Sequence, residues 1–299
     1  MNGRFAPSPT GELHLGNLRT ALLAWLFARS AGSRFLMRVE DLDPQRSKPE
    51  HEERQLADLR AIGLDWDGDV VHQSERTELY RDALARLRTQ GRVYECWCTR
   101  AEIREAVQAP HGPLPEGAYP GTCRDLTEDE REERRRSGRP AALRLDARGD
   151  AVHFHDRLHG AVIGTVDDLV LWRGDGTPAY NLAVVADDAD QGVEEVVRGD
   201  DLLDSTPRQL LLARLLGIAA PQYAHVPLVL APDGSRLAKR HGAVTLAAIG
   251  PEDALSWMAA SLGMAAPGER VTAADLLERF DPDGLPLEPT VFSPSAAAR

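Results

Sequence analysis

Strand and helix patterns alternate over the first part of the chain, and this alternation constrains the fold more than any other feature. Residues 3–8 and 35–39 have the short apolar runs of buried strands, while apolar side chains recur at helical spacing over 15–30 and 50–62. Strands connected through helices lie parallel in one sheet, with the helices packed on its faces. We therefore predict an α/β fold built on a parallel sheet.

The same alternation returns near residue 169, after a stretch of different character. Residues 94–140 hold all three cysteines, five prolines and an arginine-rich run, so we interpret them as the centre of an inserted module. Short strands of the same module are predicted over 142–145, 152–155 and 161–166. Beyond the module we predict a strand over 193–198, a helix over 205–216, a strand over 226–230, and helices over 251–262 and 273–280.

Four segments follow from these patterns. They are 1–78, the first half of a catalytic domain; 79–168, the inserted module; 169–225, the second half of the catalytic domain; and 226–299, a basic loop with a small helical subdomain. The tail from Pro282 is rich in Pro, Ala and Ser, so we expect it to be loose.

The charge of the chain limits its partners. A net charge of -12 argues against nucleic-acid binding over the whole surface, although residues 131–139 contain five arginines. Acidic neighbours of that run favour a solvated helix with mixed charge pairs. No apolar run is long enough to span a bilayer, and the sequence turns polar before Arg4. We therefore expect no membrane partner and a cytoplasmic location.

The turn over 7–17, between the first strand and the first helix, is a candidate anion site. A helix N-terminus offers backbone N–H groups and positive potential to a phosphate. His14 and Asn17 lie three residues apart, on one face of the first helical turn, and can donate to the same anion. A capped strand–helix connection without a ligand is the plainer alternative.

A basic loop over 235–242 follows the last strand of the catalytic pattern. Lys239 in this loop is a compact, mobile point charge of the kind that suits a triphosphate in its transition state. An exposed basic loop without a ligand is the alternative.

The cysteines favour a metal over disulfides. Cys96 and Cys98 are separated by one residue, and Cys123 offers a third thiolate. A closed structural zinc site needs four ligands, and on chemistry alone His111 is the fourth. Three free buried cysteines are the alternative.

Together these segments resemble the class I glutamyl- and glutaminyl-tRNA synthetases. Residues 4–11 and 14–17 are similar to the HIGH signature of that family, with Asn17 in place of its second histidine. Residues 236–240 resemble the KMSKS loop, with Ala238 where a serine is expected. Supporting matches lie at 38–43, 73–76 and 197–203. The resemblance spans about residues 3–245 and implies a Rossmann-type domain with an inserted, zinc-bearing α+β module.

The resemblance also implies roles for individual residues. It assigns catalysis to His14, Asn17 and Lys239. It assigns ATP binding to Pro7, Ser8, Thr10, Gly11, His14, Gly16, Asn17 and Lys239, and glutamate binding to Arg4, Ala6, Ser8, Glu40, Tyr180 and Arg198. Charge supports the second set, because arginines form paired N–H bonds to a carboxylate and Glu40 can take an ammonium. Some members hold one structural zinc on a set that corresponds here to Cys96, Cys98, Tyr119 and Cys123.

Chain length distinguishes branches of this family. Complete synthetases continue past the lysine loop into an anticodon-binding domain, whereas only residues 241–299 follow Arg240 here. The chain therefore resembles a short branch that activates glutamate with ATP and Mg²⁺ in the absence of tRNA. That branch transfers the glutamate to queuosine in the anticodon loop of tRNA(Asp). A minimal synthetase for tRNA(Glu) and a catalytically inactive tRNA-binding module are the alternatives, and we expect a monomer.

Overall fold

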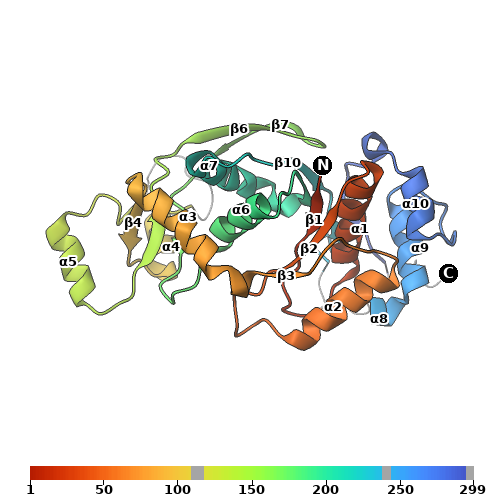
Figure 1. The fold of residues 1–299 in the computed structure, drawn as a ribbon, viewed down its shortest axis with the longest axis horizontal. Helices are drawn as coiled ribbons and strands as arrows, with labels where there is room; N and C mark the ends of the chain where they lie inside the picture. Colours follow the sequence, from red (N-terminus) through yellow and green to blue (C-terminus); the bar gives the residue numbers. More distant parts are fainter. Residues whose placement is uncertain (109–117, 238–243, 294–299) are drawn as a thin grey trace.

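The computed structural model describes residues 1–108, 118–237 and 244–293 of the chain. The molecule is elongated, with the parallel strands near its middle and the C-terminal helices at one end (Figure 1). Helix α5 (Glu128–Arg136) lies at the other end.

Three parallel strands in the order β1-β2-β3 form the first part of the sheet. They are β1 (Gly3–Phe5), β2 (Phe35–Val39) and β3 (Val71–His72), with α1 (Leu15–Ser30) and α2 (Pro49–Ala61) as the connecting helices. The helix predicted over 15–30 and the strand predicted over 35–39 are confirmed. The first strand ends at Phe5 rather than at residue 8, since Pro7 and Pro9 have no N–H to continue a ladder.

Two more parallel strands follow: β9 (Glu195–Gly199) lies beside β1, and β10 (Gln222–Val226) pairs with β9. The backbone N–H of Glu195 donates to the carbonyl of Asn2 at 3.1 Å and joins the two halves of the domain. Two helices and two 3₁₀ turns complete this region: α6 (Tyr180–Asp190), α7 (Thr206–Leu216), η1 (Gln73–Arg76) and η2 (Asp200–Ser205). The loops that follow β1 and β9 therefore lie next to each other, at the carboxyl ends of adjacent strands.

A β-hairpin extends this sheet and corrects one expectation. β6 (Ala151–Asp156) and β7 (Gly160–Thr165) pair antiparallel, and β6 then pairs parallel with β10 through Asp156 and Tyr223. The sheet order is β7-β6-β10-β9. We expected both hairpin strands to belong to the inserted module, and that expectation is wrong for their pairing. The strand pattern was correct, but the partner strand lies far away in the sequence, where no local pattern points to it.

The region that the sequence predicts to be inserted contributes to a separate sheet, in the order β4-β5-β8. Its strands are β4 (Val93–Cys96), β5 (Ala142–Leu145) and β8 (Val170–Trp172), and its helices are α3 (Thr77–Thr89), α4 (Arg100–Gln108) and α5 (Glu128–Arg136). β8 was expected to belong with the second half of the catalytic domain, but it pairs antiparallel with β5.

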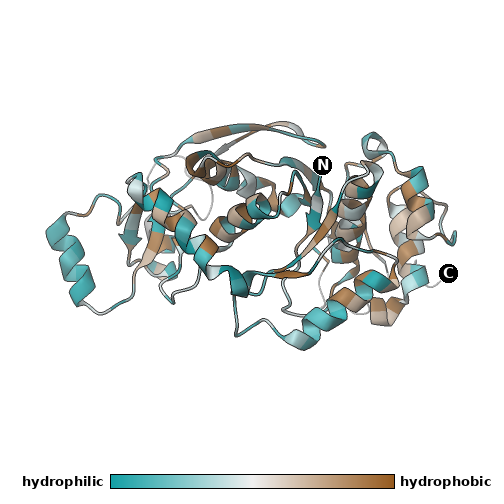
Figure 2. Ribbon diagram, in the orientation of Figure 1, coloured by the Kyte–Doolittle hydropathy of each residue, from teal (hydrophilic) through white to brown (hydrophobic). Residues whose placement is uncertain are grey.

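α5 carries most of the arginine-rich run and buries no residue. The teal ribbon of this helix in Figure 2 shows that its residues are strongly hydrophilic. Arg135 pairs with Glu95, Glu128 and Glu132, which confirms the predicted solvated helix with mixed charge pairs.

The C-terminal part packs against α1. Its elements are β11 (Val229–Leu230), α8 (Leu246–Ile249), α9 (Pro251–Ser261), α10 (Ala273–Arg279), η4 (Pro282–Gly284) and β12 (Thr290–Val291). The tail from Pro282 was expected to be loose, which is wrong up to Ser293. β12 pairs with β11, and the fully buried Phe292 packs edge-on against Trp257 with ring centroids 5.1 Å apart. The burial of this aromatic ring stabilises a segment whose composition alone favours disorder. Among the helices of the described ranges, none is long and apolar enough to cross a membrane.

Candidate active site

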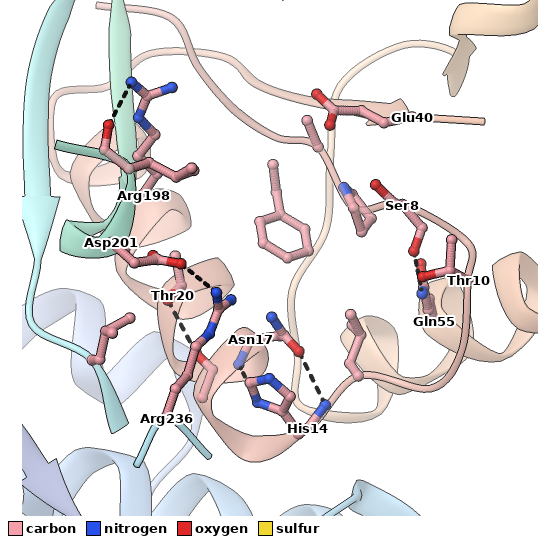
Figure 3. Close-up of a pocket in the computed structure, with 18 of the residues that line it drawn as sticks. Ser8, Thr10, His14, Asn17, Thr20, Glu40, Gln55, Arg198, Asp201 and Arg236 are labelled. Carbon is pink, nitrogen blue, oxygen red and sulfur yellow. Dashed lines mark hydrogen bonds and ion pairs between the residues drawn. The ribbon is translucent and has the colours of Figure 1, made fainter. Parts of the chain in front are cut away.

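One cavity of about 660 Å³ opens where β1 and β9 end (Figure 3). Nearly all the residues predicted to bind ATP or glutamate line it. They are Arg4, Ala6, Pro7, Ser8, Thr10, Gly11, His14, Gly16, Asn17, Glu40, Tyr180 and Arg198. Lys239, the remaining predicted residue, lies outside the described residues. The fold therefore brings together two groups of residues that are far apart in the sequence.

The start of α1 lines one side of this cavity, and His14 is the N-cap residue of this helix. The Asn17 backbone N–H donates to His14 Nδ1 at 3.2 Å, while the His14 N–H donates to the Asn17 side-chain oxygen at 3.2 Å. Because Nδ1 is an acceptor in this arrangement, a neutral His14 ring carries its proton on Nε2. The helix N-terminus and the Nε2–H group are both suited to an anion.

Gln55 supports the turn that leads into this helix, and the sequence analysis missed it. Its side-chain nitrogen donates to the carbonyl of Gly11 at 2.6 Å and to the carbonyl of Ser8 at 3.0 Å. The side chain is buried although it is polar. Gln55 stands four and seven residues before Leu59 and Ile62, so its position on the apolar face of α2 is the sequence signal that could have identified it.

A buried network of charges lies at the end of the cavity that Arg4 and Glu40 line. Arg38 is fully buried and pairs with Asp188 at 2.8 Å and with Glu40 at 3.7 Å. Arg4 pairs with Asp188 at 3.3 Å. Burial raises the pKa of Glu40 to about 7, even though the cations of Arg38 and Arg4 lower it. Glu40 therefore titrates near neutral pH in the absence of a ligand.

Arg198 reaches the cavity from the end of β9. Its Nη1 donates to Gln209 Oε1 at 2.8 Å, and its Nη2 donates to Thr206 Oγ1 at 2.8 Å. The guanidinium also lies over the ring of Tyr223, with Cζ 5.1 Å from the centroid. Tyr180, at the start of α6, lines the same cavity and keeps part of its ring exposed. The contacts with Gln209, Thr206 and Tyr223 hold the Arg198 guanidinium in one orientation.

Both ends of the segment that contains Lys239 are anchored beside this cavity. Arg236 lines the cavity and pairs with Asp201. On the other side, the N–H of Leu15, next to His14, donates to the carbonyl of Val244 at 2.8 Å. The described flanks of the predicted lysine loop thus meet the start of α1.

Comparison with known proteins identifies this constellation. Residues 1–262 match the family described as tRNA synthetases class I (E and Q), catalytic domain. The chain belongs to this family. A relative from Nocardia farcinica named Glutamyl-Q tRNA(Asp) synthetase is 62% identical over 97% of this chain and 93% of its own length. A relative of the same name from Symbiobacterium thermophilum is 51% identical over 96% of this chain and 94% of its own length.

The fold of this class I synthetase is also found in solved structures. A glutamate tRNA ligase from Elizabethkingia meningosepticum, crystallised in complex with its amino acid, superimposes with a TM-score of 0.83 at 28% identity. That match covers 99% of this chain and 68% of the ligase. The class I catalytic fold predicted from the sequence is therefore confirmed, with mixed rather than purely parallel sheets.

The three cysteines of this synthetase meet in the inserted region. Cys96, Cys98 and Cys123 bring their sulfur atoms within 4.8 Å of one another, and Cys98 and Cys123 are 3.4 Å apart. The hydroxyl of Tyr119 lies 3.3 Å from the sulfur of Cys96 and 3.5 Å from that of Cys98. Ligands about 2.3 Å from a tetrahedral zinc ion lie roughly 3.8 Å apart, so this donor set fits a metal ion. His111, the alternative fourth ligand, lies outside the described residues.

Proposed function

We propose that this synthetase activates L-glutamate with ATP in the absence of tRNA, and transfers the glutamyl group to queuosine in the anticodon loop of tRNA(Asp). The observation that carries the proposal is that Arg4, Glu40 and Arg198 line the same cavity as the N-terminus of α1. The names of the two relatives that match over more than nine-tenths of their own length support the choice of acceptor.

Activation joins the α-carboxylate of glutamate to the α-phosphorus of ATP, and pyrophosphate leaves. Little covalent chemistry is required of the protein, because positioning and charge stabilisation carry such a step. His14 Nε2–H and the amide groups of the turn before α1 bind the phosphates, with Asn17 completing the cap. Lys239 supplies the mobile positive charge, and Mg²⁺ enters with ATP.

Glutamate is bound by charge complementarity. Arg198 and Arg4 face its side-chain carboxylate, and Glu40 takes its ammonium group. Tyr180 borders the same pocket, and the small residues Ala6 and Ser8 leave room for the substrate. Glutamine has no side-chain negative charge to offer the two arginines, and this difference favours glutamate.

The metal proposed for the cysteine cluster is one structural zinc ion per chain. Cys96, Cys98 and Cys123 would supply three thiolates and Tyr119 the phenolic oxygen. A closed set of four protein ligands leaves no open position for a reactant, so the ion would stabilise the inserted region rather than take part in the reaction. The segment boundaries of the sequence analysis belong to this proposal only as divisions along the chain, since the β6–β7 hairpin of the second segment pairs with β10 in the third. A helical C-terminal subdomain also belongs to it. So do a monomeric state and a cytoplasmic location.

A second candidate function is charging of tRNA(Glu). It is favoured by the similarity to a glutamate tRNA ligase at a TM-score of 0.83. The two candidates share the activation step and differ in the acceptor.

Glutamate-dependent exchange of pyrophosphate with ATP, measured without tRNA, tests the activation step. We expect exchange with glutamate and none with glutamine. Lys239→Ala should reduce kcat by about 10²- to 10³-fold, the effect of removing one preorganised transition-state contact. If the wild-type protein shows no exchange, the activity is absent and the chain is an inactive tRNA-binding module.

A further inference from the structure

Asp156, His225 and Arg198 form a buried line of contacts that runs from the β6–β7 hairpin to the cavity. Asp156 Oδ2 lies 2.6 Å from His225 Nδ1, and Arg198 Nε donates to His225 Nε2 at 3.1 Å. Asp156 and His225 are completely buried, and Arg198 is 5% exposed. The three residues come from three adjacent strands of one sheet, in the order β6-β10-β9, and Figure 1 shows β6 and β10 near α7.

The direction of each hydrogen bond follows from the chemistry of arginine. A guanidinium only donates, so His225 Nε2 must accept, and a ring whose Nε2 accepts is neutral with its proton on Nδ1. That Nδ1–H donates to Asp156. The other oxygen of Asp156 accepts the N–H groups of Leu158 and His159, each at 3.0 Å. Asp156 is therefore an acceptor on both sides, as an ionised carboxylate is.

The protonation tendencies of the pair agree with this assignment. Burial lowers the pKa of His225 and the cation of Arg198 lowers it further, although the hydrogen bond with Asp156 raises it. Burial alone would raise the pKa of Asp156, but its hydrogen bonds with His225, His159 and Leu158 lower it below its usual value.

The partners of Arg198 leave its charge and its outer N–H groups to a ligand. Its three short hydrogen bonds go to His225, Gln209 and Thr206, all of them uncharged when His225 is neutral. They use three of the five N–H groups and leave one on each terminal nitrogen, apart from a long 3.5 Å contact between Nη2 and the carbonyl of Leu202. Two such N–H groups are what paired bonding to a carboxylate requires.

A direct Asp156–Arg198 ion pair would fix the arginine as well, but it would also neutralise it and compete with an anionic substrate. The imidazole of His225 keeps the two charges apart. Asp156 therefore fixes the orientation of the Arg198 guanidinium through the ring without neutralising its charge. Arg4 differs in this respect, because it pairs directly with Asp188 at 3.3 Å.

We propose that His225, held by Asp156 as the neutral Nδ1–H tautomer, is a positioning residue that orients Arg198 for the side-chain carboxylate of the substrate. The inference rests on the proposed function for the identity of glutamate as that substrate. It adds two residues, Asp156 and His225, that lie behind the residues lining the cavity.

Asp156→Asn tests the proposal with little change of shape. The N–H groups of Leu158 and His159 require an oxygen on their side, so the new amide nitrogen faces His225. The ring must then carry its proton on Nε2, where it can donate to Thr206 Oγ1 at 3.0 Å but can no longer accept the Arg198 Nε–H. We expect the KM for glutamate in pyrophosphate exchange to rise about 10- to 100-fold, the range for losing a hydrogen bond to a charged group, with the KM for ATP unchanged.

His155→Gln is the matched control, because His155 is the exposed neighbour of Asp156 on the same strand. It should keep the wild-type KM for both substrates. A folded Asp156→Asn protein with a wild-type KM for glutamate would overturn the proposal. Absence of exchange in the wild-type protein would instead refute the proposed function, so the two failures are distinguishable.

A second measurement needs no variant. Two-bond ¹H–¹⁵N correlation spectra of the labelled wild-type protein, with His225 assigned through its backbone, report the ring tautomer directly. A neutral Nδ1–H ring at pH 7 supports the proposal. An Nε2–H ring or a doubly protonated ring contradicts it, even if Asp156→Asn fails to fold.

Discussion

His14 and Asn17 cap each other at the start of α1: the Asn17 N–H donates to His14 Nδ1 and the His14 N–H donates to the Asn17 side-chain oxygen, both at 3.2 Å. The exchange satisfies two backbone donors at the helix terminus and fixes the ring, so that a neutral His14 presents an Nε2–H. Asn17 in place of the family's second histidine thus has a structural role of its own, because its side-chain oxygen accepts the N–H of the capping residue His14.

Gly16→Ala should separate activity from stability. A Cβ atom on residue 16 would lie 3.1 Å from Cε1 and Nδ1 of His14, closer than a side chain normally approaches a ring, so the ring must shift. We expect kcat for pyrophosphate exchange to fall by about tenfold or more, since small displacements of a positioned group have large effects on rate. Alanine is more favourable than glycine in a helix by up to about 1 kcal/mol. The midpoint of thermal unfolding should therefore stay close to the wild-type value while kcat falls. A wild-type kcat would contradict the role of His14.

Glutamate binding should weaken below neutral pH. Glu40 binds an ammonium group only as a carboxylate, and burial raises its pKa to about 7. As the pH falls through this value, protonation removes the binding form, so the KM for glutamate at pH 6 should be about tenfold higher than at pH 8. Glu40→Gln should have a high KM with no such pH dependence. A wild-type KM that is constant over this range would show that Glu40 does not receive the ammonium group.

The buried charges behind the site predict a large difference between two arginines. Arg38 is fully buried against Asp187, Asp188 and Glu40. Arg38→Leu removes the cation that these three carboxylates share, although Asp188 keeps Arg4 and Asp187 keeps Arg76. Removal of one partner from a buried group of charges lowers the free energy of unfolding by about 3–5 kcal/mol.

Arg81, which pairs with Glu78 on the exposed face of α3, is the control for Arg38. Arg81→Leu should leave the free energy of unfolding nearly unchanged, because exposed ion pairs contribute little. Urea unfolding followed by tryptophan fluorescence measures both variants. Equal effects would contradict the importance of the buried network.

Metal analysis of the purified protein tests the cysteine cluster. We expect about one zinc per chain in protein prepared without chelator, and loss of that metal in Cys98→Ser. Tyr119→Phe should lose zinc to a chelator faster than the wild-type protein, while His111→Ala should not. The reverse order would make His111 the fourth ligand, and absence of metal would leave three free cysteines.

Local patterns were sufficient for much of this fold. α1 follows from apolar residues at helical spacing, and its predicted bounds are the observed ones. Many cavity residues were predicted because they belong to contiguous motifs, each readable within one short window of sequence: the HIGH-like run over 4–17 and the shorter matches at 38–43 and 197–203.

Contacts between distant segments were not predictable in the same way. The β6–β7 hairpin was assigned to the insertion, because nothing near Asp156 indicates a partner 69 residues away at His225. The prediction of a loose tail was wrong for a similar reason, since the burial of Phe292 depends on Trp257 in α9. Gln55 and the Asp156–His225 pair act through other residues, so they belong to no contiguous motif.

Transfer of labelled glutamate to purified tRNAs tests the central claim most directly. The wild-type protein, incubated with ATP, Mg²⁺ and labelled glutamate, should label tRNA(Asp) that carries queuosine and leave tRNA(Asp) without queuosine unlabelled. Labelling of tRNA(Glu), with none of queuosine-bearing tRNA(Asp), would contradict the claim and identify a minimal glutamyl-tRNA synthetase instead.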